Sequence, residues 1–231
     1  MSELATPGSQ EGDLFEVAAI AAAVALLAAM VFRLVRAANG FGEWLCVGIA
    51  LPLGYPLADL VTGIVHWAGD RIGDEDTPIL GRRFIGPFRL HHVHPQEITQ
   101  HGFASTNGHN AIAVIPVLAT VYVAMPDPGA PGLFVTSLIT STATLGLLSN
   151  QFHKWAHAPQ VPRLVRLFQR AQLILPPERH QLHHIPPFDR HYCITAGWLS
   201  EPLFRLGFFQ GLDRLVAALS AGPPRRTRLL R

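Results

Sequence analysis

The sequence predicts an all-α integral membrane protein with about four transmembrane helices and a histidine-rich cap. Three observations lead to this fold class. The chain of 231 residues is 49% hydrophobic and only 15% charged, which is too apolar for an ordinary soluble domain. Several apolar runs approach the ~20 residues that a helix needs to cross a bilayer. All 12 histidines lie between His66 and His191, in segments that border these runs.

The first two helices are the clearest elements. Residues 1–14 are polar and lack the basic region of a secretory signal, so we expect a disordered tail. Residues 17–32 are all apolar and predict the first transmembrane helix. Residues 44–65 predict the second, with Asp59 as the only charge. A single membrane domain is expected over residues 15–220, followed by a basic tail over 221–231.

A helical hairpin is expected next. Residues 111–125 and 133–149 are apolar and are separated by PDPGAP, through which no helix would continue. Both runs are short by helical rise, so they predict either marginal spans or a re-entrant pair. Either choice returns the chain to the side that it left.

Charge distribution predicts the orientation. Of 18 Lys and Arg residues, all but Arg33 and Arg36 fall on the side that carries the histidines. The positive-inside rule makes that side cytoplasmic, and a bacterial inner membrane is the expected location. The net charge of +2 is too small to indicate a nucleic-acid partner. Because the chain has only 2 cysteines, neither a disulfide framework nor a cysteine metal site is expected.

Two short motifs place possible metal ligands at helix ends. In HKWAH, His153 and His157 are four residues apart, so a helix presents both imidazoles on one face. In HWAGD, His66 and Asp70 repeat this spacing after the second apolar run. Each pair alone is a weak signal, because a structural histidine pair or an ordinary helix end with a solvated carboxylate has the same spacing.

Two further motifs strengthen the metal interpretation. RHQLHH brings together His180, His183 and His184 between pairs of prolines that limit the helix to a turn or two. HHVHPQEITQH adds four more histidines, namely His91, His92, His94 and His101. Four separate elements thus deliver imidazoles to one membrane face. A set of scattered surface histidines would not show this clustering.

The number of candidate ligands predicts two metal ions. A zinc site uses three or four protein ligands, whereas nine or ten candidates suit two metals that each keep an open position. Spacing alone does not separate zinc, copper, manganese and iron. Beside a bilayer, the expected two-metal chemistry is oxygen activation on a lipid chain. Two-metal hydrolysis would require more carboxylates than Asp70. These arguments favour a desaturase or hydroxylase.

The motifs also carry a family resemblance. The chain is similar, over about residues 55–205, to plasmanylethanolamine desaturases in HxxxD at 66–70, TPILGRRFIGPFRLHHVHPQEITQHGFASTNGHN at 77–110, NQFHKWAHAP at 150–159 and HQLHHIPPFDRHYCITAGW at 180–198. A sister branch of plant plastid desaturases, which act on an acyl chain of phosphatidylglycerol, shares the histidine motifs. The succession of ITQH and TNGHN favours the first branch.

The resemblance implies a membrane di-iron desaturase that uses O2 and two electrons from a separate cytochrome b5-like or ferredoxin-like donor with its reductase. Its substrate would be an ether phospholipid, which loses one hydrogen each from carbons 1 and 2 of the sn-1 alkyl chain. The catalytic iron ligands carried over from the family are His66, Asp70, His91, His92, His101, His153, His157, His180, His183 and His184. His94, His109 and His191 are left out.

Several other residues receive weaker predictions. Asp59, an intramembrane carboxylate two turns before His66, is a candidate substrate contact or a helix-packing residue. Arg82, Arg83 and Arg89 are candidates for the substrate phosphate, although retention of basic residues on the cytoplasmic side is the slightly favoured explanation for each one alone. Residues 107–108 are expected to form a turn. Residues 164–175 are expected to form an amphipathic helix in the membrane interface.

Three alternatives remain open at this stage. A hydroxylase or a fatty-acyl phospholipid desaturase would share the same metal centre, and only the product separates them. A histidine-rich metal-binding membrane protein without enzymatic activity would be expected to carry polar or sulfur ligands within its spans, which hold little of these. A haem protein would need paired histidines at mid-span, and none lies there.

Overall fold

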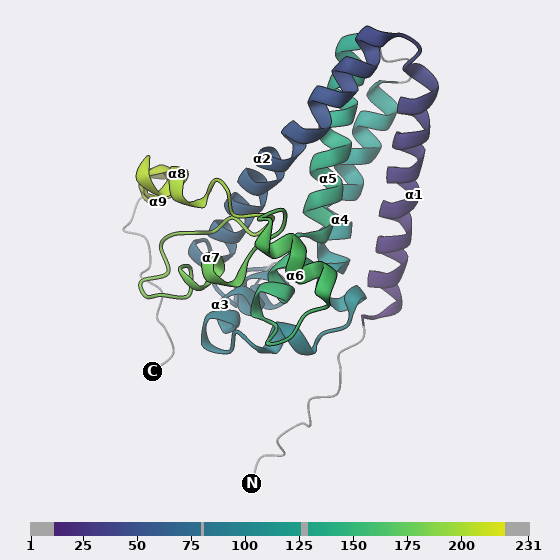
Figure 1. The fold of residues 1–231 in the computed structure, drawn as a ribbon. Coiled ribbons are helices and arrows are strands. Elements are labelled where there is room, and N and C mark those ends of the chain that lie inside the picture. The colour runs from purple at the N-terminus through teal and green to yellow at the C-terminus, as the bar shows by residue number, and fades with distance from the viewer. Residues whose placement is uncertain (1–11, 80, 126–128, 220–231) are drawn as a thin grey trace.

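A computed structural model describes residues 12–79, 81–125 and 129–219, and within these ranges the regular elements are all helical. Figure 1 shows four long helices side by side, with short helices gathered around one end of the bundle. The long helices are α1 (Leu14–Ala37), α2 (Phe41–Arg71), α4 (Phe103–Ala124) and α5 (Ala130–His157). All four are long and apolar enough to cross a membrane, which confirms the predicted fold class.

Local side-chain contacts explain where the first two helices begin. At the start of α1, the Asp13 side chain accepts from the N–H of Glu16, and the Glu16 side chain accepts from the N–H of Asp13. At the start of α2, Glu43 accepts from the N–H groups of Asn39 and Gly40. Leu14, predicted in the tail, is therefore already helical. Residues 1–11 of that tail and the whole predicted basic tail lie outside the described residues.

The bundle is arranged around α5. Helix α5 packs against both α2 and α4, and α1 packs mainly against α4. Ser141 on α5 donates to the backbone carbonyl of Leu51 on α2, at 2.7 Å, which is the type of interhelical hydrogen bond common within membranes. Large apolar side chains such as Phe32, Leu45 and Ile49 are exposed on the outside of the bundle. Lipid would cover them.

Both helices of the predicted hairpin are longer than their apolar runs. Helix α4 has 22 residues and α5 has 28, which favours full spans over the re-entrant alternative. The predicted turn at residues 107–108 is wrong, because both residues lie inside α4. Asn107 bridges the two helices: its side-chain oxygen accepts from the N–H of Gln151 at 3.2 Å. Hydropathy alone did not reveal the first turns of α4, because their polar side chains form hydrogen bonds with α5.

The short helices form a cap at one end of the bundle. They are η1 (Gly81–Ile85), α3 (Gly86–Val93), η2 (Glu97–Gln100), α6 (Arg163–Arg170) and α7 (Pro177–Gln181). Helices α8 (Ser200–Arg205) and α9 (Phe208–Leu219) follow and lie beside α2 (Figure 1). The predicted interfacial helix over residues 164–175 ends at Arg170. Ile174 and Leu175 are instead buried against the bundle, because the chain turns inward there.

The cap lies at the end where α2 and α5 finish and α1 and α4 begin (Figure 1). The histidine-bearing segments therefore share one end of the bundle, as the even number of crossings predicted.

Asp59 ties the C-terminal segment to the bundle. Its side chain is fully buried in α2, and its two oxygens accept from the N–H groups of Ala196, Gly197 and Leu199 at 2.8–3.0 Å. Such bonds to a carboxylate are among the stronger hydrogen bonds in proteins. The chain itself occupies both oxygens, so these bonds do not support the predicted substrate contact, which stays a prediction. The helix-packing alternative is closer to what this residue does.

Candidate metal centre

Nine of the ten predicted ligands converge into two groups beneath the cap. Within each group, one potential ligand atom from every residue lies within 4.8 Å of all the others. The first group, called the five-histidine group below, contains His91, His153, His157, His180 and His184. The second, called the carboxylate group, contains His66, Asp70, His92 and His183. Each group has enough nitrogen and oxygen ligands for one metal ion.

The long helices supply the i, i+4 pairs. His66 and Asp70 project from α2 into the carboxylate group, and His153 and His157 project from α5 into the five-histidine group. Residues four apart lie about one helical turn apart on the same face of a helix. The predicted placement of each pair on one helical face is therefore confirmed.

Adjacent histidines in the cap belong to different groups. His91 and His92 are neighbours on α3, and His183 and His184 are neighbours just after α7, yet each pair is divided between the two groups. Neighbouring side chains point in different directions along a helix or turn. The two pairs therefore link the groups, with ring centroids 6.2 Å apart for the first pair and 5.5 Å for the second.

Unsatisfied ring nitrogens indicate that the site suits a metal. Buried polar atoms normally have hydrogen-bond partners. Among the described residues, the Nε2 atoms of His66, His91, His157 and His183 are buried without one, as is an oxygen of Asp70. In the five-histidine group, the Nε2 atom of His180 lies 2.7 Å from that of His153 and 3.0 Å from that of His184. Lone pairs directed at a common point fit a metal ion.

The carboxylate group is held close around Asp70. One Asp70 oxygen lies 3.1 Å from Nε2 of His92, and the other lies 3.3 Å from Nε2 of His183 and 3.7 Å from Nε2 of His66. All four side chains are largely or fully buried. This arrangement places one negative charge beside one group only, so the two sites are chemically different.

Burial keeps the cap histidines neutral. Burial first, and neighbouring histidines second, lower the pKa of His184 to about 2 and hold the pKa values of His91 and His180 well below the ordinary value of 6.5. Neutral imidazole is the form that binds metals. These histidines are therefore in the metal-binding form at neutral pH.

These lowered pKa values predict that the metal-free protein loses stability as the pH falls from about 7 to about 5.5. The unfolded chain binds protons near pH 6.5, whereas the folded cap does not, so stability decreases by up to ~1.4 kcal/mol per pH unit for each such histidine. Thermal unfolding in detergent at several pH values measures this slope. His184→Asn should reduce the slope, and unfolding temperatures that do not fall with pH would contradict the prediction.

Backbone carbonyls orient two ligands of the carboxylate group. Nδ1 of His66 lies 3.1 Å from the carbonyl oxygen of Tyr192, and Nδ1 of His183 lies 2.8 Å from that of Arg190. These bonds leave Nε2 free for a metal, as is usual for metal-bound histidines. Sequence reasoning did not predict this role of Arg190 and Tyr192, because a backbone carbonyl leaves no residue-type signal. The continuation of this segment, residues 196–199, is the stretch that Asp59 anchors.

The remaining predicted residues lie elsewhere. His101 is in neither group, and its ring lines the neighbouring cavity while its carbonyl accepts from Lys154. Its role as a ligand stays a prediction. Arg89 donates to the carbonyl of Gly73 at 2.5 Å and does not line the cavity, so its proposed phosphate contact lacks support. Arg82 and Arg83 belong to η1, and their side chains lie outside the described part of the chain.

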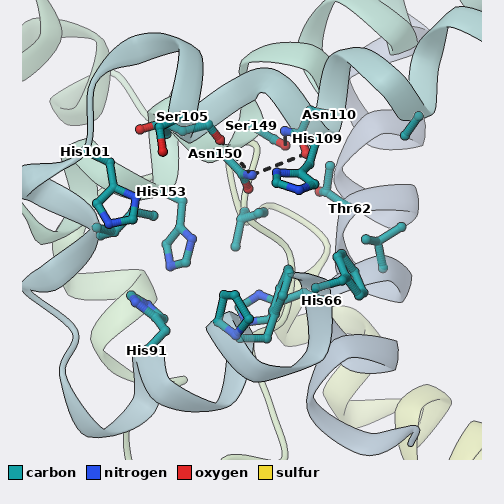
Figure 2. A pocket seen from close by; sticks show the side chains of 18 of the residues that line it. Thr62, His66, His91, His101, Ser105, His109, Asn110, Ser149, Asn150 and His153 are labelled. Carbon is teal, nitrogen blue, oxygen red and sulfur yellow. Dashed lines mark hydrogen bonds between the residues drawn. The ribbon is translucent and has the colours of Figure 1, made fainter. Parts of the chain in front are cut away.

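A cavity of about 690 Å³ reaches both metal groups. Stripes from three helices line it, at the spacing of successive helical turns. The stripe of α5 forms one wall with Gly146, Ser149, Asn150 and His153. Figure 2 shows His66, His91 and His153 directed toward the same space, with Asn110 and Asn150 beside it. The polar lining residues outside the histidines were not predicted, because they lay in the assumed loop or within apolar runs.

The cavity extends away from the metals along apolar helix faces. Val61 and Val65 of α2 lie on one side and Ala113 and Val114 of α4 on the other. Val61 and Val65 are more than 40% exposed. The cavity therefore has apolar walls on α2 and α4, as an alkyl chain would require.

The fold and the site define a helical membrane protein with a histidine-rich cluster that could hold metal ions, beside a partly apolar cavity. Residues 55–227 match the family model of the lipid desaturase domain, and the chain belongs to this family. It is a membrane lipid desaturase.

Three relatives illustrate the match. The chain is 41% identical to plasmanylethanolamine desaturase of Myxococcus xanthus, over 91% of this chain and 74% of that protein. It is 37% identical to plasmanylethanolamine desaturase 1 of Mus musculus, over 74% and 65%. It is 35% identical to the chloroplastic fatty acid desaturase 4 of Arabidopsis thaliana, over 76% and 54%. No solved structure matches the chain.

Proposed function

We propose that this chain introduces the vinyl-ether double bond of plasmalogens, between carbons 1 and 2 of the sn-1 alkyl chain of a plasmanyl phospholipid. The observation that carries the proposal is the cavity, which joins both metal groups to apolar faces of the membrane-spanning helices α2 and α4. The similarity to two plasmanylethanolamine desaturases, over most of this chain, supports this particular substrate.

The metals in this proposal are two iron ions, one in each histidine group. When bound, they would supply the activation of O2 that is needed to remove hydrogen from unactivated carbon. With two electrons from a donor and two protons, O2 leaves as two molecules of water while the alkyl ether becomes a vinyl ether. The donor set of imidazoles and one carboxylate is compatible with iron.

The chain's own residues position the substrate. In the proposed pose, the alkyl tail lies between Val61 of α2 and Val114 of α4, along the α5 wall at Gly146. Its first two carbons then lie beside His66 and His153, where both metal groups reach the cavity. The apolar walls keep water from this part of the cavity, and fixed orientation lowers the entropic part of the barrier.

We place the metal centre on the cytoplasmic face of a bacterial inner membrane. The support is the excess of basic residues at the capped end of the bundle, with Arg33 and Arg36 toward the other end. A separate cytochrome b5-like or ferredoxin-like protein with its reductase would then deliver electrons from the cytoplasm.

Product analysis tests this function. Cells that express the protein and are fed a 1-O-alkyl lipid should form an acid-labile vinyl ether that is lighter than its precursor by two hydrogen atoms. Lipid mass spectrometry before and after mild acid measures it. Cells that express an Asp70→Asn, His183→Ala double variant are the matched control and should form none.

Two other products would overturn the proposal. A new double bond in an ester-linked acyl chain would assign the acyl desaturation that the name of the Arabidopsis relative describes. A product heavier by one oxygen atom would assign hydroxylation.

A further inference from the structure

The lining of the cavity carries three carboxylates. Glu16, Glu75 and Glu97 line it, together with polar groups that include Ser105 and His101. Among the described residues of the lining there is no lysine or arginine. A carboxylate in a cavity wall attracts a cation and repels an anionic group.

Glu16 is the carboxylate that is built into the helical bundle. Its side chain is only 15% exposed, and one of its oxygens accepts from the N–H of Asp13 at 3.1 Å. It packs directly on Gly108 of α4: a Cβ atom at that glycine would lie 2.6 Å from the Cβ atom of Glu16. Gly108 thus makes room for Glu16 at the cavity wall. By contrast, Glu75 is exposed on a loop.

A second hydrogen-bonding group faces Glu16 from α4. Nδ1 of His109 lies 3.7 Å from an oxygen of Glu16, and His109 also lines the cavity. His109 is 49% exposed, so its ring can move aside. The Glu16 oxygen on this side has no closer partner among the described residues.

The same cavity also reaches histidine ring nitrogens that have no hydrogen-bond partner among the described residues. They are the Nε2 atoms of His66 and His91, which line the cavity and are both more than nine-tenths buried. A single molecule in this cavity can therefore reach the carboxylates with one end and the metal groups with the other. An ethanolamine ether phospholipid has this layout, because its ammonium is separated from the reacting carbons by the phosphate and glycerol.

We propose that Glu16 is a specificity-determining residue that receives the primary ammonium of an ethanolamine headgroup. This inference rests on the proposed function and adds the group that selects the headgroup. A primary ammonium offers three N–H donors to the carboxylates. A glycerol headgroup leaves the lipid with a net negative charge, which the acidic wall disfavours, and a choline headgroup has no N–H to donate.

Competition between headgroups tests the inference. Purified, metal-loaded protein in nanodiscs, supplied with electrons, receives 1-O-alkyl lipids that differ only in an ethanolamine, choline or glycerol headgroup. We expect Glu16→Gln to lower kcat/KM for the ethanolamine lipid by about tenfold or more, which is the effect of losing one charge-assisted hydrogen bond. Its kcat/KM for the glycerol lipid should stay equal or rise. Native mass spectrometry of bound lipid gives a readout that is independent of turnover.

Asp13→Ala is the matched control. It removes the other half of the helix cap and leaves the Glu16 carboxylate in place, so the preference for ethanolamine should persist. Equal losses for all three headgroups in Glu16→Gln would assign a purely structural role and overturn the inference. If wild-type protein forms vinyl ether with no headgroup preference, the inference fails while the proposed function stands. If no headgroup yields vinyl ether, the proposed function fails.

Discussion

Alanine at His183 and alanine at His184 should have different effects, although the two residues are neighbours. His183→Ala leaves the carboxylate group with three protein ligands against four in the unmodified protein, so its metal should bind more weakly and metal content in dilute metal should fall from about two ions per chain toward one. Desaturation should fall roughly a thousandfold or more, because a bound metal contributes several kcal/mol of transition-state stabilisation. His184→Ala leaves four imidazoles in the five-histidine group. This variant should keep most of its metal and lose activity by about 10- to 100-fold.

Elemental analysis and product formation on the same purified samples measure both effects. The control is His94→Ala, since His94 is exposed and belongs to neither group. It should keep full metal content and activity. Identical metal loss in His183→Ala and His184→Ala would mean that the neighbours serve one ion, contrary to the division between two groups.

Gly146→Leu should block the substrate without disturbing the protein. An added Cβ atom at Gly146 meets no atom within 4 Å, and the residue lines the cavity on α5. A leucine there projects into the space proposed for the alkyl chain. We expect desaturation to fall by about a hundredfold, which is the scale on which pockets discriminate by steric fit. Metal content and unfolding temperature should not fall, because leucine also favours the helix over glycine.

Gly48→Leu is the control for this experiment. Gly48 also has open space around its added Cβ atom, but it lies in the first part of α2 and does not line the cavity. Its activity should match that of the unmodified protein, and Gly146→Ala should fall between the two variants. Wild-type activity in Gly146→Leu would show that the alkyl chain takes another route.

The TNGHN segment shows how polar residues can mislead an interpretation based on hydropathy. The sequence indicated a turn at residues 107–108, since Asn-Gly is a common turn dipeptide. In the structure, Asn107 joins α4 to α5, and Gly108 admits Glu16 from α1. Both roles depend on helices that are distant in sequence, so no local pattern could reveal them.

The sequence alone predicted the class of fold, the clustering of histidines and nine candidate ligands that the structure brings together. These follow from local physics: apolar length predicts a span, and i, i+4 spacing places His66 with Asp70 and His153 with His157. Only the tertiary structure decided how the ligands divide into two groups. It also decided that Asp59 is an anchor, that His101 lies apart from both groups, and that α2, α4 and α5 enclose a cavity. These features depend on the directions of side chains from separate helices, which hydropathy and spacing do not encode.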